Sequence, residues 1–234
     1  MRKTLVLHSH LWATVLMLVM FVVSTLTGSR TPGGQELLSG PRYLQGKVIV
    51  LDPGHGGGDP GTVGVGPSSE AENVLAVAWE LKGMLERAGA KVIMTRSSDQ
   101  SPAWGTVYAE KENGQLAVRV AAANRSSGQI FISLHNDWHA DSSVSGTSVH
   151  YYKSQDLALA EALQRSLARH LDTVDLGVRR SNFYVLRNTP MPAALVEIGF
   201  LSNAQEAARL AQPTYRLEVA RALLMGINEY FASF

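Results

Sequence analysis

A buried strand that ends abruptly in a histidine-containing turn is the feature of this sequence that most constrains its fold. Residues 48–51 (Val-Ile-Val-Leu) are apolar and mostly β-branched, as in a strand that is covered on both faces. The Asp-Pro-Gly at 52–54 cannot continue such a strand, so the chain turns at its carboxyl end. His55 follows directly and is surrounded by the glycines at positions 54, 56, 57 and 58. We therefore expect its imidazole to be accessible to a ligand.

Strands and helices alternate from Lys47 onward. The expected strands are 48–51, 91–95, 130–134, 147–152, 183–186 and 194–198. The expected helices are a first one from a Ser69 cap to Gly89, then 116–127, 157–171 and 214–231. This alternation predicts an α/β fold of three layers, in which helices cover both faces of a mostly parallel sheet.

We expect the first 27 residues to be a signal peptide or, as we favour, an uncleaved signal anchor. Two basic residues precede an apolar run over residues 11–26, which is at the short end for a membrane span. No Ala-x-Ala motif follows it, and its basic end would stay inside, so the remainder would be exported. Residues 28–45 have the composition of a linker, and residues 46–234 are expected to form a single catalytic domain.

Composition excludes several classes of function. The formal net charge is +1 and the sequence has no basic run, which argues against nucleic acid as a partner. The chain has no cysteine, so it can form neither a disulfide nor a thiolate metal site, and any metal must be held by histidine and carboxylate side chains.

Three polar residues follow or end separate predicted strands. His55 follows the first strand, His135 follows 130–134, and Glu197 lies near the end of 194–198. The carboxyl ends of strands in an open α/β sheet form the ligand crevice, so these residues can converge there. Two imidazoles and a carboxylate, with one position left for water, form a common catalytic zinc site.

An acidic ligand close to His55 is the remaining requirement. Glu70 and Glu72 both lie at the start of the first expected helix. If Ser69 caps this helix, Glu72 turns back toward the cap, whereas Glu70 occupies the first helical position and can face the crevice. We therefore expect Glu70, rather than Glu72, to be the ligand.

Seven segments of the sequence together carry a resemblance to a known family. In order, they are DPGHGG (52–57), EAENVL (70–75), TRSSD (95–99), RVAAAN (119–124), ISLH (132–135), FYVLR (183–187) and VEIGFLSN (196–203). In order and spacing they resemble the zinc-dependent N-acetylmuramoyl-L-alanine amidases of bacterial cell-wall metabolism. The resemblance extends from about Lys47 to Phe234. It implies a mixed, largely parallel sheet, zinc as the cofactor and peptidoglycan as the substrate, with cleavage between N-acetylmuramic acid and L-alanine.

The resemblance also implies roles for individual residues. His55, Glu70 and His135 would bind zinc, and Glu197 would be the catalytic acid/base. The family usually has His-x-Asn after the third strand, whereas here His135 is followed by Asn136 and then Asp137. Asp137 would take over the hydrogen bonding of that asparagine, or the local loop differs. Asp137 is therefore one candidate for binding substrate, and Arg187 is a second, through the carboxylates of the stem peptide.

The layout of one catalytic domain behind a membrane-targeting segment resembles the germination-specific, spore-cortex amidases. In those enzymes, stem-peptide removal prepares muramic acid for conversion to a δ-lactam by a separate deacetylase. An accessory lipoprotein or that deacetylase would then be a partner. The protein would be located in the space between the membranes of the forming spore. Alternatives are a vegetative cell-separation amidase, a zinc peptidase that cuts elsewhere in the stem, and an inert cell-wall binding protein.

Overall fold

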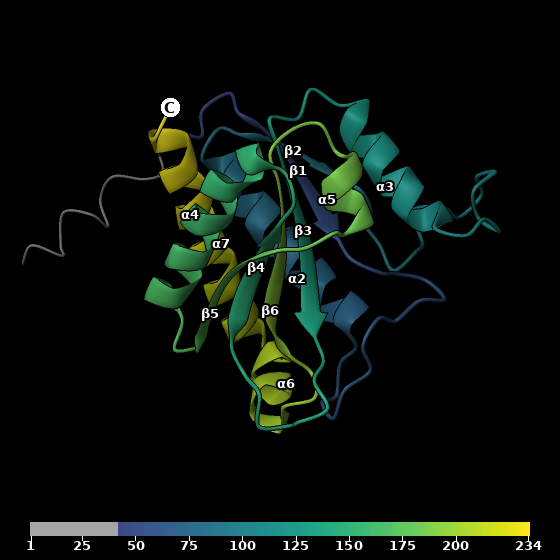
Figure 1. Cartoon of the computed structure of the whole chain (residues 1–234), viewed down its shortest axis with the longest axis vertical. Coiled ribbons are helices and arrows are strands. Elements are labelled where there is room, and N and C mark those ends of the chain that lie inside the picture. The colour runs from purple at the N-terminus through teal and green to yellow at the C-terminus, as the bar shows by residue number, and fades with distance from the viewer. Residues whose placement is uncertain (1–41) are drawn as a thin grey trace, which may run out of the picture. The chain divides into compact units, whose positions relative to one another are not determined.

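Six strands form one mixed sheet at the centre of the folded domain (Figure 1). The structure is a computed structural model, and it describes residues 42–234. The strands are β1 (Val48–Pro53), β2 (Lys91–Met94), β3 (Ile130–Asp137), β4 (Thr147–Tyr151), β5 (Asp175–Arg180) and β6 (Ala193–Phe200). The helices are α2 (Glu70–Arg87), α3 (Gly114–Asn124), the 3-10 helix η1 (Ser154–Asp156), α4 (Leu157–His170), α5 (Tyr184–Asn188), α6 (Ala204–Leu210) and α7 (Pro213–Ala232).

The strand order across the sheet is β2-β1-β3-β6-β4-β5. Strands β2, β1, β3 and β6 are parallel to one another, β4 is antiparallel to β6, and β5 is parallel to β4. The expected mixed and mostly parallel sheet is therefore confirmed. Because β1, β3 and β6 are neighbours with the same direction, the residues at their carboxyl ends lie beside one another.

Helices cover both faces of the sheet unequally. Helices α2, α4 and α7 share the larger hydrophobic core with one face, and α3 and α5 share a smaller core with the other. On β3, Ile132 belongs to the larger core and Phe131 to the smaller one. Successive side chains of a strand point to opposite faces, so His135 lies on the face of Phe131. By the same alternation, Glu197 shares this lightly covered face with Leu195.

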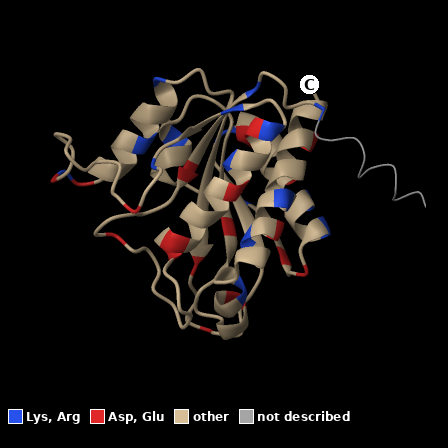
Figure 2. Cartoon of the chain, turned by 180° about the vertical axis from the view of Figure 1, so that it is seen from behind, with Lys and Arg blue, Asp and Glu red and all other residues tan. Residues whose placement is uncertain are grey.

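On the side of the molecule opposite to the view of Figure 1, neither positive nor negative residues predominate. Figure 2 shows Lys and Arg interspersed with Asp and Glu along the helices on that side. This distribution agrees with the formal net charge of +1.

Besides the short helices η1 and α6, which the expected elements did not include, two elements differ from the sequence prediction. Residues 183–186 were expected to be a strand, but α5 (Tyr184–Asn188) is a helix whose Val185 and Leu186 pack into the smaller core. A short apolar run fits either structure, and local periodicity cannot distinguish the two. The edge strand β5 (Asp175–Arg180) was missed because Gly177, with φ of +75°, and a charged end interrupt its pattern.

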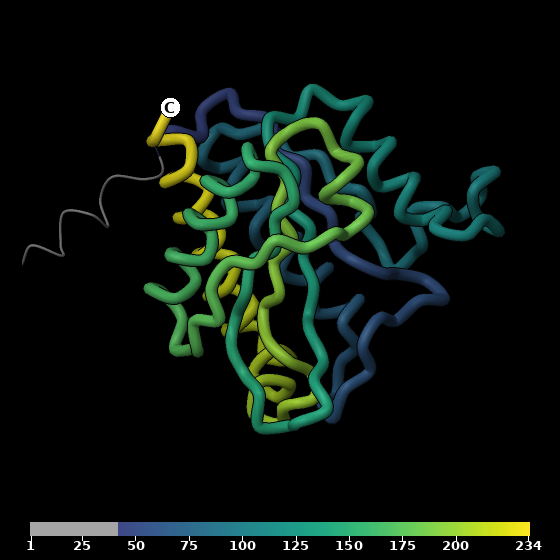
Figure 3. The backbone as a smooth tube through the Cα atoms, viewed as in Figure 1, coloured from purple at the N-terminus to yellow at the C-terminus, as the bar shows by residue number. Residues whose placement is uncertain are grey.

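The chain between β5 and α5 crosses the front of the sheet. It can be followed in Figure 3 as the light green segment that leads from β5 across to α5. Ser181 and Phe183 in this segment both contact His150 of β4, through a 2.6 Å hydrogen bond and an edge-on ring contact respectively. The crossing segment thereby brings α5 onto this face of the sheet, where Val185 and Leu186 pack with Phe131, Ala193 and Leu195.

The packed domain begins slightly earlier than expected. Leu44, placed in the linker by the sequence, is fully buried in the larger core, and the backbone N–H of Tyr43 donates to Asn228 of α7. The expected signal anchor (1–27) and most of the expected linker (28–45) lie outside the described residues. Within residues 42–234, no helix is long and apolar enough to cross a membrane.

Candidate metal centre and active site

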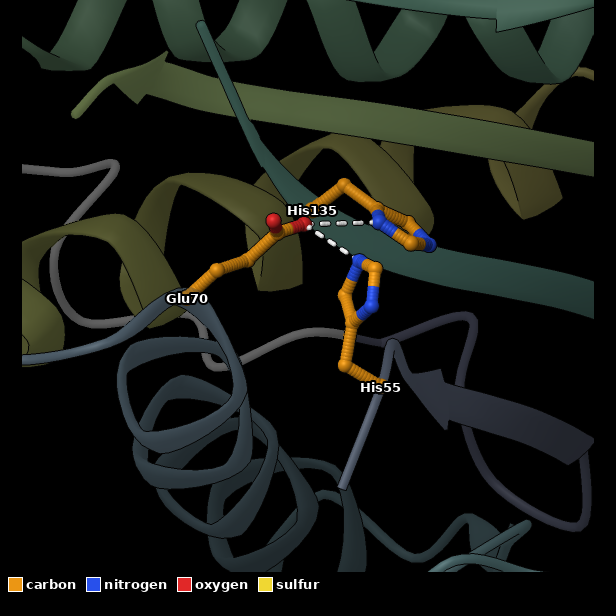
Figure 4. Close-up of side chains that lie close together, drawn as sticks. All are labelled: His55, Glu70 and His135. Atoms are coloured by element: carbon orange, nitrogen blue, oxygen red, sulfur yellow. Dashed lines mark hydrogen bonds and ion pairs between the residues drawn. The ribbon is translucent and has the colours of Figure 1, made fainter. Parts of the chain in front are cut away.

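Three side chains that are far apart in the sequence meet at the carboxyl ends of β1 and β3 (Figure 4). Nε2 of His55 lies 3.0 Å, and Nδ1 of His135 lies 2.8 Å, from the same carboxylate oxygen of Glu70. The potential ligand atoms of the three residues all lie within 4.8 Å of one another. The structure thus brings together the three residues that the sequence singled out as metal ligands.

Glycines next to His55 make room for this cluster. A Cβ atom at Gly54 would overlap the imidazole of His135, and one at Gly61 would lie 2.6 Å from Oε2 of Glu70. His55 itself has φ of +60°, which a residue other than glycine adopts only at some energetic cost. The turn after β1 therefore has a specific shape that lets three ligand side chains approach one another.

Gly56 and Gly57, which follow His55, allow close packing of the backbone, whereas the sequence suggested that they make room for a ligand at the imidazole. A Cβ atom at Gly56 would lie 2.8 Å from the carbonyl oxygen of Gln100, and one at Gly57 would lie 2.8 Å from the backbone nitrogen of Ser101. These two glycines allow the chain after β2 to pack against the His55 turn. The side chain of His55 nevertheless remains 25% exposed, in agreement with the expected accessibility of its imidazole.

Glu70 occupies its place because of how α2 begins. Oγ of Ser69 accepts a 3.3 Å hydrogen bond from the backbone N–H of Glu72, which makes Ser69 the N-cap and Glu70 the first helical residue. Glu72 does not turn back, and its carboxylate lies 4.0 Å from Arg216 instead. Burial acts to raise the pKa of Glu70, but hydrogen bonds from His135 and His55 outweigh it and hold this pKa well below its usual value.

Asp59 is a site residue that the sequence analysis missed. Its Oδ2 lies 2.9 Å from Nδ1 of His55 and accepts a 2.8 Å hydrogen bond from Nε2 of Gln115. A carboxylate on Nδ1 favours a proton there, which makes Nε2 the nitrogen of His55 that can bind a metal ion. The sequence signal was available, since Asp59 lies in the same glycine-rich turn, four residues after His55.

Two buried arginines hold the turn that carries His55. Arg119 of α3 forms a 2.7 Å ion pair with Asp52 and donates to the backbone carbonyls of Pro53 and His55. Arg96 donates to the carbonyls of Pro53, Gly54 and Ala71. Both arginines therefore have a structural role, because their guanidinium groups bind the backbone carbonyls of the turn.

Glu197 lies next to His135, because the two residues are partners in the pairing of β6 with β3. The side chain is only 8% exposed, and its Oε2 has no hydrogen-bond partner among residues 42–234. Burial raises the pKa of Glu197 well above its ordinary value, and the nearby carboxylates of Asp137 and Glu70 raise it further. A buried carboxyl group with a raised pKa is suited to accept and donate a proton.

His55, His135 and Glu197 all open into one cavity of ≈ 280 Å³. Gln115 and Leu116 of α3 line one part of it. The crossing segment and α5 contribute the other side chains on the rim, which are Phe183, Tyr184 and Val185. The cavity thus combines the candidate ligands, a buried carboxyl group and an apolar wall.

The two candidate substrate-binding residues lie outside this lining. Arg187 is exposed on α5 and donates a 2.7 Å hydrogen bond to Asn182. The carboxylate of Asp137 accepts from the backbone N–H of Trp138 at 2.7 Å. The neighbouring Asn136 is buried with neither side-chain polar atom hydrogen-bonded within the described residues. The structure therefore assigns no substrate contact to Arg187 or Asp137.

The chemistry of the three clustered residues fits a divalent metal. Nitrogen from two imidazoles and oxygen from a buried carboxylate is a donor set of catalytic zinc sites. Glu70 is only 3% exposed and has its charge directed at both histidines, so a cation between them would replace two hydrogen bonds with stronger interactions. His55 also has the carboxylate partner on its other nitrogen that metal-binding histidines usually have.

Comparison with known proteins gives a consistent result. A family model described as N-acetylmuramoyl-L-alanine amidase matches residues 49–229. The chain is 37% identical over 193 residues to the germination-specific N-acetylmuramoyl-L-alanine amidase of Bacillus subtilis (strain 168), covering 80% of this chain and 81% of that protein. It is also 35% identical over 209 residues to the probable cell wall amidase LytH of Staphylococcus epidermidis, covering 88% of this chain. The chain spans 65% of the length of that LytH.

Solved structures show the same similarity. The CwlD amidase of Clostridioides difficile, determined in complex with the GerS lipoprotein, has a TM-score of 0.74 and 31% identity, over 80% of this chain and 100% of that one. The catalytic domain of CwlV from Bacillus (Paenibacillus) polymyxa var. colistinus has a TM-score of 0.71 and 34% identity, over 80% and 98%. Since the family match extends from β1 into the last helix, the chain belongs to the N-acetylmuramoyl-L-alanine amidase family.

Proposed function

We propose that this chain is a zinc-dependent amidase that hydrolyses the bond between N-acetylmuramic acid and L-alanine in peptidoglycan. The observation that carries the proposal is the meeting of His55, Glu70 and His135 beside the buried carboxyl group of Glu197, with both histidines and Glu197 lining one cavity. Family membership supports the substrate class, because the geometry alone fits hydrolysis of many amides.

His55, Glu70 and His135 would hold the zinc ion. When bound, zinc supplies Lewis acidity to the scissile carbonyl and to the attacking water. Glu197, which is not one of the three ligands, accepts a proton from that water and passes it to the nitrogen of the departing L-alanine. The C–N bond breaks as the new C–O bond is completed, so the products are a free lactyl carboxylate and a stem peptide with a free amino terminus.

Mass spectrometry of the products tests this assignment. Peptidoglycan incubated with the zinc-loaded chain should release stem peptides that begin with L-alanine. The Glu197→Gln variant, prepared in the same way, is the matched control and should release none. New reducing sugar ends or free D-alanine would identify another bond and contradict the proposal, and tight peptidoglycan binding without any product would favour a binding protein.

We propose that Asp137 and Arg187 assist substrate binding from the rim of the site. Arg187 lies on α5, whose first residue, Tyr184, lines the cavity, and Asp137 is close enough to Glu197 to affect its pKa. Arg187→Ala should raise KM with little change in kcat. Arg165→Ala, an exposed substitution on α4 at the other face of the sheet, is the control and should change neither.

We further propose a role in spore cortex maturation. The support is the similarity to the germination-specific amidase of Bacillus subtilis, of which the chain covers 81%, and to CwlD. The similarity to the cell wall amidases named LytH supports the vegetative alternative. Deleting the gene should leave vegetative cells separating normally while the spore cortex loses its muramic δ-lactam. Chained vegetative cells with an unchanged cortex would overturn this role.

The location and partners follow from the same proposal. Residues 1–27 would anchor the chain in the membrane through the linker 28–45, with the catalytic domain on the extracytoplasmic side. The complex of CwlD with a lipoprotein supports an accessory lipoprotein partner for this chain, and δ-lactam formation requires a deacetylase. A fusion of residues 1–45 to a reporter that is active only outside the cytoplasm should be active and sediment with membranes.

A further inference from the structure

Helix α3 presents two side chains, one turn apart, to the turn that carries His55. Residues at i and i+4 of a helix lie on the same face, and here they are Gln115 and Arg119. Arg119 is fully buried and binds the carbonyl oxygen of His55. Gln115 is partly buried, lines the cavity and reaches Asp59. One helix therefore contacts both the backbone of His55 and the carboxylate that binds its ring.

The contacts of Asp59 form a short chain of hydrogen bonds. Oδ2 accepts a 2.8 Å hydrogen bond from Nε2 of Gln115 and lies 2.9 Å from Nδ1 of His55. Oδ1 accepts a 3.0 Å hydrogen bond from the backbone N–H of Gly61. The side chain of Asp59 is 38% exposed, so packing alone does not fix its orientation. Gln115 supplies the contact from outside the turn that holds this carboxylate against the imidazole.

We propose that Gln115 is a positioning residue for the metal site. It holds Asp59 on Nδ1 of His55, and Asp59 in turn keeps Nε2 directed toward Glu70 and His135. Partners of this kind, which touch a ligand rather than the metal, set the tautomer and orientation of the ring. The inference rests on the proposed function, since it concerns the zinc site that this function requires.

Zinc affinity of the full chain, measured by competition with a chelator, tests the inference. Gln115→Met keeps the length of the side chain but removes the donor, and it should weaken zinc binding about 10-fold, at the lower end of the range for such partners. Gln205→Met, at an exposed position on α6, is the matched control and should leave the affinity unchanged.

A double-mutant cycle separates positioning from a general structural effect. Asp59→Ala should weaken zinc binding at least as much as Gln115→Met, and adding Gln115→Met to Asp59→Ala should weaken it no further, because Gln115 acts through Asp59. The thermal midpoint of the metal-free chain should be the same with Gln115 and with Met at this position.

The possible outcomes are distinct. Zinc affinity of Gln115→Met within twofold of the unaltered chain, or independent losses that add in the double variant, would overturn the role of Gln115 and leave the proposed function intact. An unaltered chain that binds no zinc would overturn the proposed function itself, and the inference with it.

Discussion

Removal of one partner from the buried ion pair between Asp52 and Arg119 should strongly destabilise the domain. Both side chains are at most 2% exposed, and their charged atoms are 2.7 Å apart. Arg119→Met would keep an unbranched side chain of similar length but leave the carboxylate of Asp52 buried with two hydroxyl partners, Thr95 and Ser133. Removing one partner of a buried pair typically destabilises a protein by about 3–5 kcal/mol.

This range translates into a measurable change in melting temperature. For a chain of about 150–250 residues, each kcal/mol lowers Tm by about 2–4 °C, so Arg119→Met should lower it by about 6–20 °C. Arg165→Met is the control, because Arg165 and its partner Glu161 are both exposed and 3.9 Å apart. Such surface pairs contribute about 0–1 kcal/mol, and the control should stay close to the unaltered chain.

The pH dependence gives an independent check. Burial acts to raise the pKa of Asp52, but Arg119 and the two hydroxyl groups outweigh it and lower this pKa. The stabilisation from Asp52 is therefore present above its unfolded pKa and is lost as pH falls through the lowered value. In Arg119→Met, burial is unopposed by the guanidinium and raises the pKa of Asp52, so that variant instead loses stability as pH rises.

The pH dependence of the unaltered chain and that of Arg119→Met both reduce the difference in stability between them as pH falls. The difference in Tm should be largest near neutral pH and should narrow on acidification, first because Asp52 becomes protonated in the variant and, below its unfolded pKa, because the unaltered chain loses its own stabilisation. Circular dichroism melts of the metal-free chain at several pH values measure it directly. A loss of less than about 3 °C at pH 7, or a difference that does not narrow on acidification, would refute the reasoning. Adding Asp52→Asn to Arg119→Met should recover part of the loss.

Three further outcomes are expected. Glu197→Gln should keep the zinc measured by metal analysis but reduce turnover at least about 100-fold, and an empty site in this variant would mean that ligand and acid/base were exchanged. Gly54→Ala should weaken zinc binding because its Cβ would overlap the imidazole of the β3 histidine, whereas Gly58→Ala, with open space around it, should not. Leu44→Ala should lower the free energy of unfolding by about 2–5 kcal/mol, measured by urea denaturation. Tyr43→Ala, at a residue that is 50% exposed, should have a smaller effect, and equal losses would contradict the packed position of Leu44.

Elements with a strong local pattern were predictable from the sequence. Helix α4 was expected over residues 157–171 because leucines recur at every fourth position, and it spans Leu157–His170. Strands β1, β3 and β6 were expected because they are continuous apolar runs, which is typical of strands covered on both faces. In α4 the buried leucines are the residues that set the helical period. In the three strands nearly the whole apolar run is buried.

Elements whose structure depends on distant partners were not predictable. Residues 183–186 could be read as a strand, but α5 begins at Tyr184, and its Val185 and Leu186 pack into the smaller core on one face of the sheet. Strand β5 exists because it can pair with β4 at the edge of the sheet, although its own sequence is charged and contains Gly177. Short-range pattern carries no information about such neighbours.

The sequence by itself determined that His55, His135 and Glu197 lie toward the carboxyl ends of the central strands, and therefore at the same end of the sheet. Its capping signal at Ser69 also favoured Glu70 over Glu72. The tertiary structure alone decided what surrounds His55. Apart from Asp59, which is only four residues away, these surroundings are Gln115, which binds Asp59, and Arg119, which binds the His55 carbonyl, both on a helix more than 50 residues further along the chain. Hydrogen bonds over such separations depend on how α3 packs on the sheet, and no periodicity in the sequence records that packing.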